Sequence, residues 1–494
     1  MDICLLGRFN GNTWIERKMT NSQERHSAIY MLGRIVPAAI NLGSTAVFTR
    51  LAAPDTYAVF VVAYASAQIG SALFFQWLRQ GLLRFAPSAS KSEVVGTIGA
   101  LYAIQAVITL ALTVLLASFT NIQTPELTLL CGALTLGQAW FDFVQELQRA
   151  EMKSKKYALL FFLRSATGLI LGALALTLTG SGVWLTLAVL ISFLVPPTPF
   201  VATAFKGASF DKRLMQKVVT YSWPLIISTS LATAGMVGDR ILVAAMMDAA
   251  HAGQYGPSVD IARQGIFVFV QGVALAGYPF AIRALEAGDR EGAMLQLRKN
   301  AELLVLIAMP ATLGVIAVSE SIASVLLGPE YQSSARLLLP ISAVASLAMC
   351  LRTFYFDQAM QLGKKTGGQV AVSVVILATF ISTSAILIPR VGIMGAATAL
   401  LASQLIGLLA SWLIGRVYFK LPFPLTTFIK VLLASAGMYA SITIFKKFLP
   451  QDGMLSLVLL IVSGAIVYSA AVLAMNTLGC RDYIQRRLVQ GRRS

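Results

Sequence analysis

The sequence predicts an all-α polytopic membrane protein of about 14 transmembrane helices, built from two repeated six-helix bundles and two extra C-terminal helices. Three observations lead to this fold class. The composition is far more apolar than that of a soluble domain. Apolar runs of membrane-spanning length recur along the whole chain. Short polar motifs of the first half return in the same order in the second half.

Hydrophobic residues make up 57% of the chain and charged residues only 12%. The mean hydropathy is +0.73, whereas a soluble domain carries about 25% charged residues. The composition therefore excludes an ordinary soluble protein, and no segment between the apolar runs is long enough for a sizeable soluble domain. The cysteines show neither metal-ligand nor redox spacing, which argues against a disulfide framework. They are Cys4, Cys131, Cys350 and Cys480.

Fourteen runs of about 20 apolar residues are each long enough to cross the hydrocarbon layer as a helix. Their expected bounds are 28–48, 57–78, 95–118, 127–147, 157–178, 183–204, 218–245, 254–282, 300–318, 336–361, 369–388, 393–415, 424–445 and 454–476. The segment 320–336 has a Gly-Pro break before a tyrosine, so we expect a helix-turn at the membrane interface there.

The net charge of +17 is concentrated on one predicted side of the membrane. With the N-terminus inside, 28 Lys and Arg residues lie in cytoplasmic segments and 5 in outer loops. Basic loops of membrane proteins stay in the cytoplasm, so both termini are predicted to be cytoplasmic. The basic excess thus reflects topology and suits anionic lipid headgroups; it does not indicate a nucleic-acid partner.

Two polar motifs end the fourth and tenth spans: FDFVQELQ (141–148) and FYFDQAMQ (354–361). Phe, Phe, Gln and Gln recur in them at the same spacing, 213 residues apart. Two further correspondences follow in the same order, at offsets of 198 and 210: Tyr57 with Tyr255, and Gly182 with Gly392. Ordered matches at similar offsets indicate a duplicated six-helix unit. Since six is even, both copies have the same orientation, as in secondary transporters that rock about a central site.

The expected domain boundaries follow from the spans, the repeat and the polar segments. They are a cytoplasmic N-terminal arm (1–27), an N-terminal six-helix bundle (28–205), a cytoplasmic inter-bundle linker (206–217), a C-terminal six-helix bundle (218–423), helices 13 and 14 (424–476) and a basic cytoplasmic tail (477–494). The arm has no cleavable-signal pattern, and Met19 is an alternative start to Met1.

Four motifs lie in a fixed order along the chain: LAAPDTYAVF (51–60), MVGDRILVAAMM (236–247), LLGPEY (326–331) and VGIMGAATALLAS (391–403). Together they resemble the polysaccharide-transporter (Wzx-type) branch of the multidrug/oligosaccharidyl-lipid/polysaccharide (MOP) flippase superfamily, over most of residues 28–476. The resemblance implies two six-helix bundles around a central cavity that opens alternately to cytoplasm and periplasm. It also implies a multi-pass protein of the bacterial cell inner membrane.

The resemblance further implies a flippase for undecaprenyl-diphosphate-linked oligosaccharide, moved from the cytoplasmic to the periplasmic leaflet for O-antigen, capsule or exopolysaccharide synthesis. Expected partners are this lipid-linked oligosaccharide, anionic membrane lipids, a polysaccharide polymerase and a chain-length regulator. We expect a monomer without a metal, cofactor or nucleic acid. Two alternatives stay open: a cation or drug antiporter of the same superfamily, and a lipid II flippase. A membrane enzyme is disfavoured, because the chain has two histidines and no nucleophile motif.

Polar side chains within the spans are the candidates for a cavity, because a charge at the centre of a span costs at least ~2.5–3.5 kcal/mol. The fork of arginine suits a diphosphate, and Gln and Asn suit sugar hydroxyls. The expected substrate-binding residues are Arg34, Asn41, Arg164, Arg240, Arg263 and Arg352. The expected gate and sugar contacts are Asp142, Gln145, Gln148, Gln358 and Gln361. Asp239 and Asp260 are the expected ion-coupling residues.

Several of these residues also have a simpler structural interpretation. Arg34 and Arg164 lie about two turns from the predicted cytoplasmic end, where a long side chain can extend to the headgroups. Asp260 and Arg263 can neutralise each other, and Asp357 can reach the nearby interface. Arg352 lies far from either end of its span, so a purely structural role is hardest to assign to it.

The charge asymmetry predicts the sidedness of four loops. Reporter fusions after Ser181 and after Pro389 are expected to give a periplasmic signal, and fusions at Lys155 and Lys365 a cytoplasmic one. Enzymatic reporters that are active on only one side of the membrane measure this directly. A cytoplasmic signal after Pro389 would contradict the arrangement of fourteen spans.

Overall fold

The computed structural model of the chain describes residues 33, 35–86, 90–119, 125–201, 205, 207–223, 225–363, 365, 367–449 and 453–477. Helices are the only regular secondary structure in these ranges. Twelve helices are long and apolar enough to cross a membrane, or thirteen when one bent pair counts as a span. A helix satisfies its backbone N–H and C=O groups internally, as a chain in hydrocarbon must. The predicted all-α, multi-pass fold class is confirmed.

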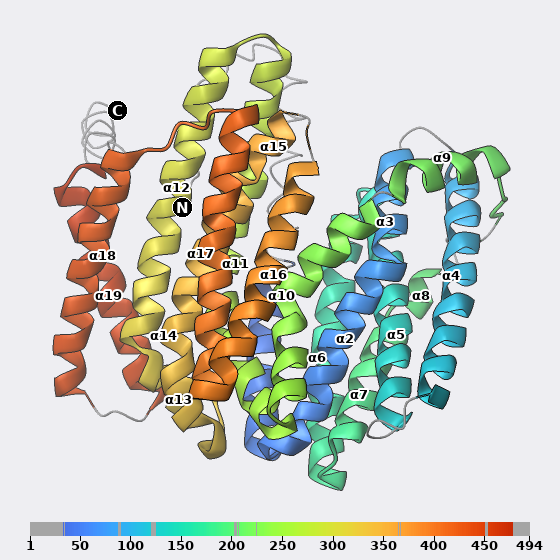
Figure 1. Cartoon of the computed structure of the whole chain (residues 1–494), viewed down its shortest axis with the longest axis horizontal. Helices are drawn as coiled ribbons and strands as arrows, with labels where there is room; N and C mark the ends of the chain where they lie inside the picture. The colour runs from blue at the N-terminus through green and yellow to red at the C-terminus, as the bar shows by residue number, and fades with distance from the viewer. Residues whose placement is uncertain are drawn as a thin grey trace, which may run out of the picture.

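The first half of the chain forms one group of helices, here called the N-lobe (Figure 1). It comprises the Ile35–Leu51 helix, α2 (Pro54–Phe74), α3 (Gln76–Phe85), α4 (Lys91–Phe119), α5 (Pro125–Ala150), α6 (Ser154–Thr179), α7 (Gly182–Leu194), α8 (Thr198–Val201) and α9 (Lys212–Ser222). Phe143, Leu134 and Leu160 are among its fully buried side chains.

The second group of helices, the C-lobe, lies beside the first (Figure 1). It comprises α10 (Leu225–Met246), α11 (Ala249–Glu286), α12 (Arg290–Ala317), α13 (Ser319–Leu326), α14 (Pro329–Leu351), the π-helical turn η1 (Arg352–Phe356), α15 (Gln358–Leu362), α16 (Gly367–Val391) and α17 (Ile393–Tyr418). Within the N-lobe, α2 is the helix that packs against both α10 and α11, so the inter-lobe contact runs along it.

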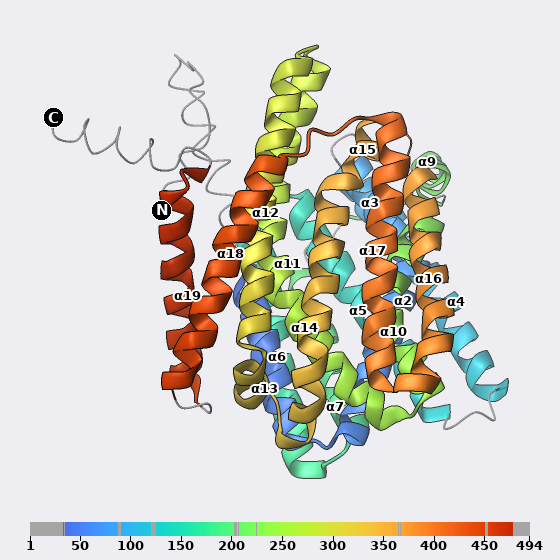
Figure 2. The same ribbon diagram turned by 60° about the vertical axis from the view of Figure 1, so that its left-hand side comes forward.

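Two further helices stand outside the lobes. They are α18 (Leu425–Phe445), continued by the short 3-10 helix η2 (Lys446–Phe448), and α19 (Met454–Ala474). Figure 2 shows α18 against α12, with α19 beyond it. The Tyr468 hydroxyl of α19 donates to the Leu306 carbonyl of α12 at 2.7 Å. This outer pair matches the two helices that the sequence places outside the repeat.

Some expected spans differ from the helices in their bounds. Fourteen were expected; the first, 28–48, lies partly outside the described residues, and its described part belongs to the shorter Ile35–Leu51 helix. The eighth is the long helix α11, which bends by 41° between Gly272 and Gly277. In the segment 320–336 the expected break is present, because Gly328 precedes α14 and Pro329 occupies its first turn, where a missing N–H costs nothing.

The expected seventh span, 218–245, is divided in the structure. Helix α9 ends at Ser222 and α10 begins at Leu225, so α9 is a separate amphipathic helix that extends the predicted linker to Ser222. Its apolar side, with Leu214 and Val218, packs against α3 and α4. The backbone N–H of Asp211 also donates to the Thr97 hydroxyl of α4 at 2.9 Å. The linker is therefore fixed to the N-lobe. Figure 1 shows it across one end of that lobe, here called the linker end, opposite the α13 end.

The repeated motifs make one matching contact in the two lobes. The ring of Phe143, in the first motif, lies 6.0 Å (centroid to centroid) from that of Phe205, which follows the expected sixth span, 183–204. Phe356, in the second motif, lies 6.0 Å from Phe423, which follows the last helix of the C-lobe. Aromatic pairs at this separation attract each other. Each motif thus places a phenylalanine against an aromatic residue that follows the last expected span of its half; the duplication itself stays a prediction.

Packing inside the N-lobe requires a glycine at the start of α7. A Cβ on Gly182 would lie 2.0 Å from the Thr56 carbonyl oxygen of α2. We expect Gly182→Ala to cost ~1–3 kcal/mol through overpacking and to lower the unfolding temperature of the detergent-solubilised protein. The control is Gly43→Ala, because a Cβ on Gly43 meets nothing within 4 Å. An unchanged unfolding temperature for Gly182→Ala would contradict the close approach of α7 to α2.

Candidate functional site

Arg164 and Asn41, two of the expected cavity residues, come together in the N-lobe. Arg164 Nη1 donates to Asn41 Oδ1 at 3.4 Å, and its Nη2 donates to the Tyr64 hydroxyl at 3.3 Å. The guanidinium lies over the ring of Phe193, 4.3 Å from the centroid, in cation–π geometry. Arg164 is only 9% exposed and its Nε has no partner. The side chain therefore points into the lobe and does not extend to the headgroups.

Asp260 joins two arginines in the C-lobe. Its Oδ1 accepts from Arg240 Nη2 and from Arg263 Nη2, each at 2.5 Å. Arg240 is 3% exposed, whereas the Asp260 side chain is 31% exposed. Tyr57, on the inter-lobe helix α2, lies close enough to interact electrostatically with both Asp260 and Arg240. This cluster therefore lies at the interface between the lobes, and the Asp260 carboxylate pairs with both guanidiniums.

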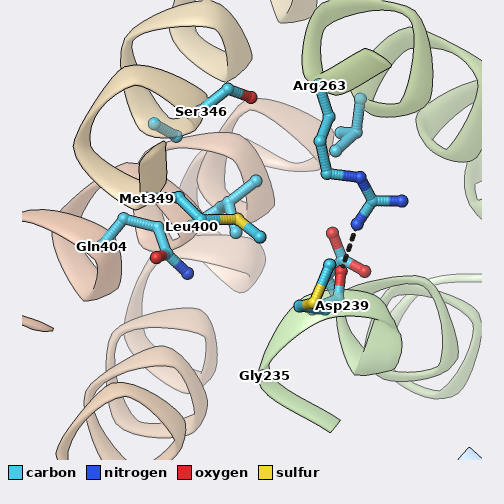
Figure 3. A pocket seen from close by; sticks show the side chains of 10 residues that line it. Gly235, Asp239, Arg263, Ser346, Met349, Leu400 and Gln404 are labelled. Carbon is cyan, nitrogen blue, oxygen red and sulfur yellow. Dashed lines mark hydrogen bonds between the residues drawn. The ribbon is translucent and has the colours of Figure 1, made fainter. Parts of the chain in front are cut away.

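Asp239, beside that cluster, is a buried carboxylate without an ion-pair partner in the described part of the chain. Its Oδ1 accepts from the backbone N–H of Arg240 at 3.0 Å, and its Oδ2 has no hydrogen bond. The residue lines a small pocket between α10, α11, α14 and α17 (Figure 3). In this pocket Arg263 donates to the Met236 carbonyl at 2.7 Å, and Gln404 enters from the opposite side.

Arg352, two residues before the second repeated motif, forms a largely buried ion pair with Asp357 of that motif. Its Nη1 lies 2.7 Å from Asp357 Oδ2, and Asp357 Oδ1 accepts from the Ser411 hydroxyl at 2.6 Å. The expectation that Asp357 reaches the interface is wrong, because its carboxylate is buried between these two donors. The pair spans the π-helical turn η1, which widens the end of α14. Turns of this type are frequent at functional sites.

The four glutamines of the predicted gate differ in exposure. Gln145, Gln148 and Gln358 are buried, and each has one side-chain atom without a hydrogen-bond partner. Gln361 alone is exposed. In this conformation only Gln361 is therefore accessible from outside the helix packing. A buried amide atom without a hydrogen-bond partner costs free energy. Gln145, Gln148 and Gln358 would therefore gain from a conformation that brought new hydrogen-bond partners to these atoms.

Asp142, the remaining gate candidate, is engaged by an arginine that the sequence interpretation missed. Arg79 Nη1 lies 3.0 Å from Asp142 Oδ2, and Arg79 Nη2 lies 3.5 Å from Glu146 Oε2. Glu146 also pairs with Arg149 at 3.0 Å. The expected second span ends at residue 78, whereas Arg79 lies on α3, the helix that continues α2 beyond Phe75. Arg79 follows Phe75 by four residues and precedes Leu82 by three, and both are buried, so this helical spacing was the available signal.

The arginines inside the lobes thus fall into two classes. Arg240, Arg263 and Arg352 each have a carboxylate within ion-pair distance. Arg164 has none among the residues that the structure describes; its partners are an amide, a phenol and an aromatic ring. Arg34, the remaining candidate, lies outside the described residues. Arg164 is therefore the described membrane-interior guanidinium whose charge is not neutralised by an ion pair.

Comparison with known sequences gives one family. The sequence profile of the polysaccharide biosynthesis protein family (Polysacc_synt_3) matches residues 47–336, more than half of the chain. The matched region includes most of the N-lobe together with the Arg240–Asp260–Arg263 cluster. No curated protein sequence matches the chain significantly.

Comparison with solved structures gives one fold. The chain is similar to the lipid II flippase MurJ in an inward closed conformation, with a TM-score of 0.74 and 14% identity over 92% of this chain and 100% of that one. It is also similar to an inward-facing multidrug resistance MATE transporter of the MOP superfamily, with a TM-score of 0.62 and 14% identity over 79% and 97%. A MATE transporter from Vibrio cholerae gives a TM-score of 0.56 and 15% identity over 81% and 97%.

These comparisons agree with the fold described above and with the motifs in the sequence. Both kinds of structural neighbour are membrane transporters, and their low identity to this chain makes the likeness one of fold. The family match, by contrast, covers most of the first lobe and the helices at the lobe interface. The chain is a multi-pass membrane protein with the fold of the MOP superfamily, and it belongs to the polysaccharide biosynthesis protein family.

Proposed function

We propose that the chain flips an undecaprenyl-diphosphate-linked oligosaccharide from the cytoplasmic to the periplasmic leaflet of the bacterial inner membrane by alternating access. The observation that carries the proposal is the unneutralised guanidinium of Arg164. Its direct contacts are neutral, and the nearby carboxylate of Asp142, which interacts with it electrostatically, lies beyond ion-pair distance and is paired with Arg79. A membrane-interior positive charge without a direct ion pair is expensive unless an anion joins it. The diphosphate of the cargo is such an anion.

The groups around Arg164 fit this role. Its partners Asn41 and Tyr64 bind it at 3.4 and 3.3 Å, distances long enough that a charged acceptor would compete well for the same donors. Asn41 and Tyr64 are both partly exposed, and Tyr64 lies on α2, the helix that runs along the lobe interface. An anion that enters between the lobes could therefore reach the guanidinium through them.

The Asp260 cluster is the second proposed element of the binding surface. Arg240 and Arg263 share one carboxylate that is itself partly exposed. A diphosphate that displaced Asp260 from either arginine would receive a donor from the C-lobe while Arg164 supplied one from the N-lobe. Contacts from both lobes would draw them together, so that binding favours a change of state.

Arg164→Ala should reduce flipping by on the order of tenfold to a hundredfold, because a charge-assisted contact contributes ~1.5–3 kcal/mol. Arg164→Lys should retain part of the activity, since it keeps the charge and loses the fork. The measurement is transfer of lipid-linked oligosaccharide across proteoliposomes, with surface polysaccharide in cells as the second readout. Arg84→Ala is the control, because Arg84 is an exposed arginine of α3 in the same lobe. Wild-type transfer by a well-folded Arg164→Ala protein would refute the role.

The same assay compares cargoes. Lipid II is the cargo named for one structural neighbour, and it also carries a diphosphate, so Arg164 alone does not select between the two. Side-by-side transfer of lipid II and of an oligosaccharide-linked carrier does. We expect the oligosaccharide-linked carrier to be preferred, because the chain belongs to a polysaccharide biosynthesis family.

A cation or drug antiporter is the second candidate, and Asp239 is the observation that favours it. A buried carboxylate with a free oxygen can take up a proton or a cation. Asp239→Asn keeps the shape of the side chain and removes this capacity. We expect the variant to retain oligosaccharide flipping. If flipping is absent from the parent protein while a proton gradient drives cation efflux that Asp239→Asn abolishes, the antiporter replaces the flippase.

A further inference from the structure

The turn between the Ile35–Leu51 helix and α2 is enclosed at the α13 end by two segments of the C-lobe. The first segment is the loop before α14. A Cβ on Gly328 would lie 1.9 Å from the Thr49 carbonyl oxygen and 3.3 Å from Arg50 Cα. The Gly328 N–H donates to the Thr49 hydroxyl at 3.2 Å. Backbone therefore lies directly on backbone here, which only glycine permits.

The second segment is the first turns of α11. A Cβ on Gly253 would lie 1.9 Å from the Pro54 carbonyl oxygen and 3.3 Å from the Ala58 N atom. One turn further along, a Cβ on Gly256 would lie 2.8 Å from Val61 Cγ1. The start of α2 is thus held against α11 as tightly as Thr49 is held against Gly328.

Side chains close the space between these two contacts. The Tyr331 hydroxyl donates to the Ala52 carbonyl at 2.8 Å, and the Tyr331 and Tyr57 rings meet edge to face at 6.2 Å. Arg50 donates to the Val325 carbonyl. Tyr331, Tyr57 and Ala52 are all buried, so no path for solvent or cargo passes between the lobes at this point.

We propose that Gly253 and Gly328 form a latch that closes the lobes at the α13 end, and that this latch must part once in every cycle of the proposed flipping. The role of the latch in a transport cycle rests on the proposed function. The closed seam itself is a property of the structure. Within the described residues its polar contacts are hydrogen bonds to backbone carbonyls from a tyrosine hydroxyl and an arginine, and one from a backbone N–H to the Thr49 hydroxyl. None of them is an ion pair.

The chemistry of the latch suits a contact that is made and broken repeatedly. A buried ion pair would have to be separated and resolvated at each opening, at a cost of several kcal/mol. The contact between a glycine and a backbone carbonyl depends on close packing instead, and water can replace the few hydrogen bonds of the latch when it opens. Adding one methyl group should consequently disfavour only the closed state.

The test uses the full-length protein with its four natural cysteines replaced by alanine and a single Ala52→Cys probe. Ala52 is 8% exposed in the closed seam, so the probe should react slowly with a membrane-impermeant thiol reagent. Gly328→Ala or Gly253→Ala should raise the labelling rate by on the order of tenfold or more, because the closed state can no longer form. Tyr331→Phe, which keeps the ring and removes one hydrogen bond, should raise it by a smaller factor.

Two matched variants separate the latch from general loosening. Gly96→Ala introduces a backbone clash of similar size, 2.3 Å from the Ser209 carbonyl oxygen, but between α4 and the linker of the N-lobe. It should lower stability and leave the labelling rate unchanged. Gly265→Ala lies on the same helix as Gly253 and meets only an ordinary contact at 3.6 Å, so it should change neither stability nor the labelling rate. Slow labelling in folded Gly328→Ala and Gly253→Ala, or fast labelling in Gly96→Ala, would overturn the latch.

Labelling and transport are measured independently, so the two proposals can fail separately. If the glycine variants label quickly and the parent flips no oligosaccharide, the latch stands and the proposed cargo is wrong. If the parent flips oligosaccharide and the glycine variants flip it at the parent's rate while their probe stays protected, the latch is wrong and the flippase stands.

Discussion

The cost of an isolated charge in a membrane governs the arrangement of polar groups in this protein. Each membrane-interior charge must be paired, solvated by a cavity or matched by a ligand. Asp260 satisfies two arginines, Asp357 satisfies Arg352, and Asp142 with Glu146 satisfies Arg79. These ion pairs also tie helices to one another. Arg164 stands apart because its direct contacts are neutral and the nearby Asp142 is paired with Arg79, and the proposed cargo site follows from that difference.

The sequence predicted the spans well because hydrophobic length is a local property. Most of the long apolar runs became helices, and the motifs at 141–148 and 354–361 each place a phenylalanine, Phe143 or Phe356, against another aromatic ring. The boundary at 218 was less accurate. The last turn of α9, from Val218, runs directly into the apolar sequence of α10, whereas its first turn is polar; the separate helix is defined by the packing of α9 on α3 and α4.

The partners of the charged residues could not be predicted in the same way. Asn41 and Arg164 were both singled out, yet their contact joins residues 123 positions apart. A purely structural role was hardest to assign to Arg352, because it lies far from either end of its expected span. The π-helical turn instead brings Asp357, five residues on, within 2.7 Å. A regular helix would not place residues five apart on one face.

The connection between the lobes has a mechanical consequence. The chain passes from the N-lobe to the C-lobe once among the described lobe helices, between Trp223 and Leu225 at the linker end, and α9 is fastened to the N-lobe just before that point. A short tether at one end of two rigid bodies acts as a pivot, and displacement grows with distance from it. The latch lies at the α13 end, opposite the tether, where a small rotation about the tether displaces the lobes farthest from each other.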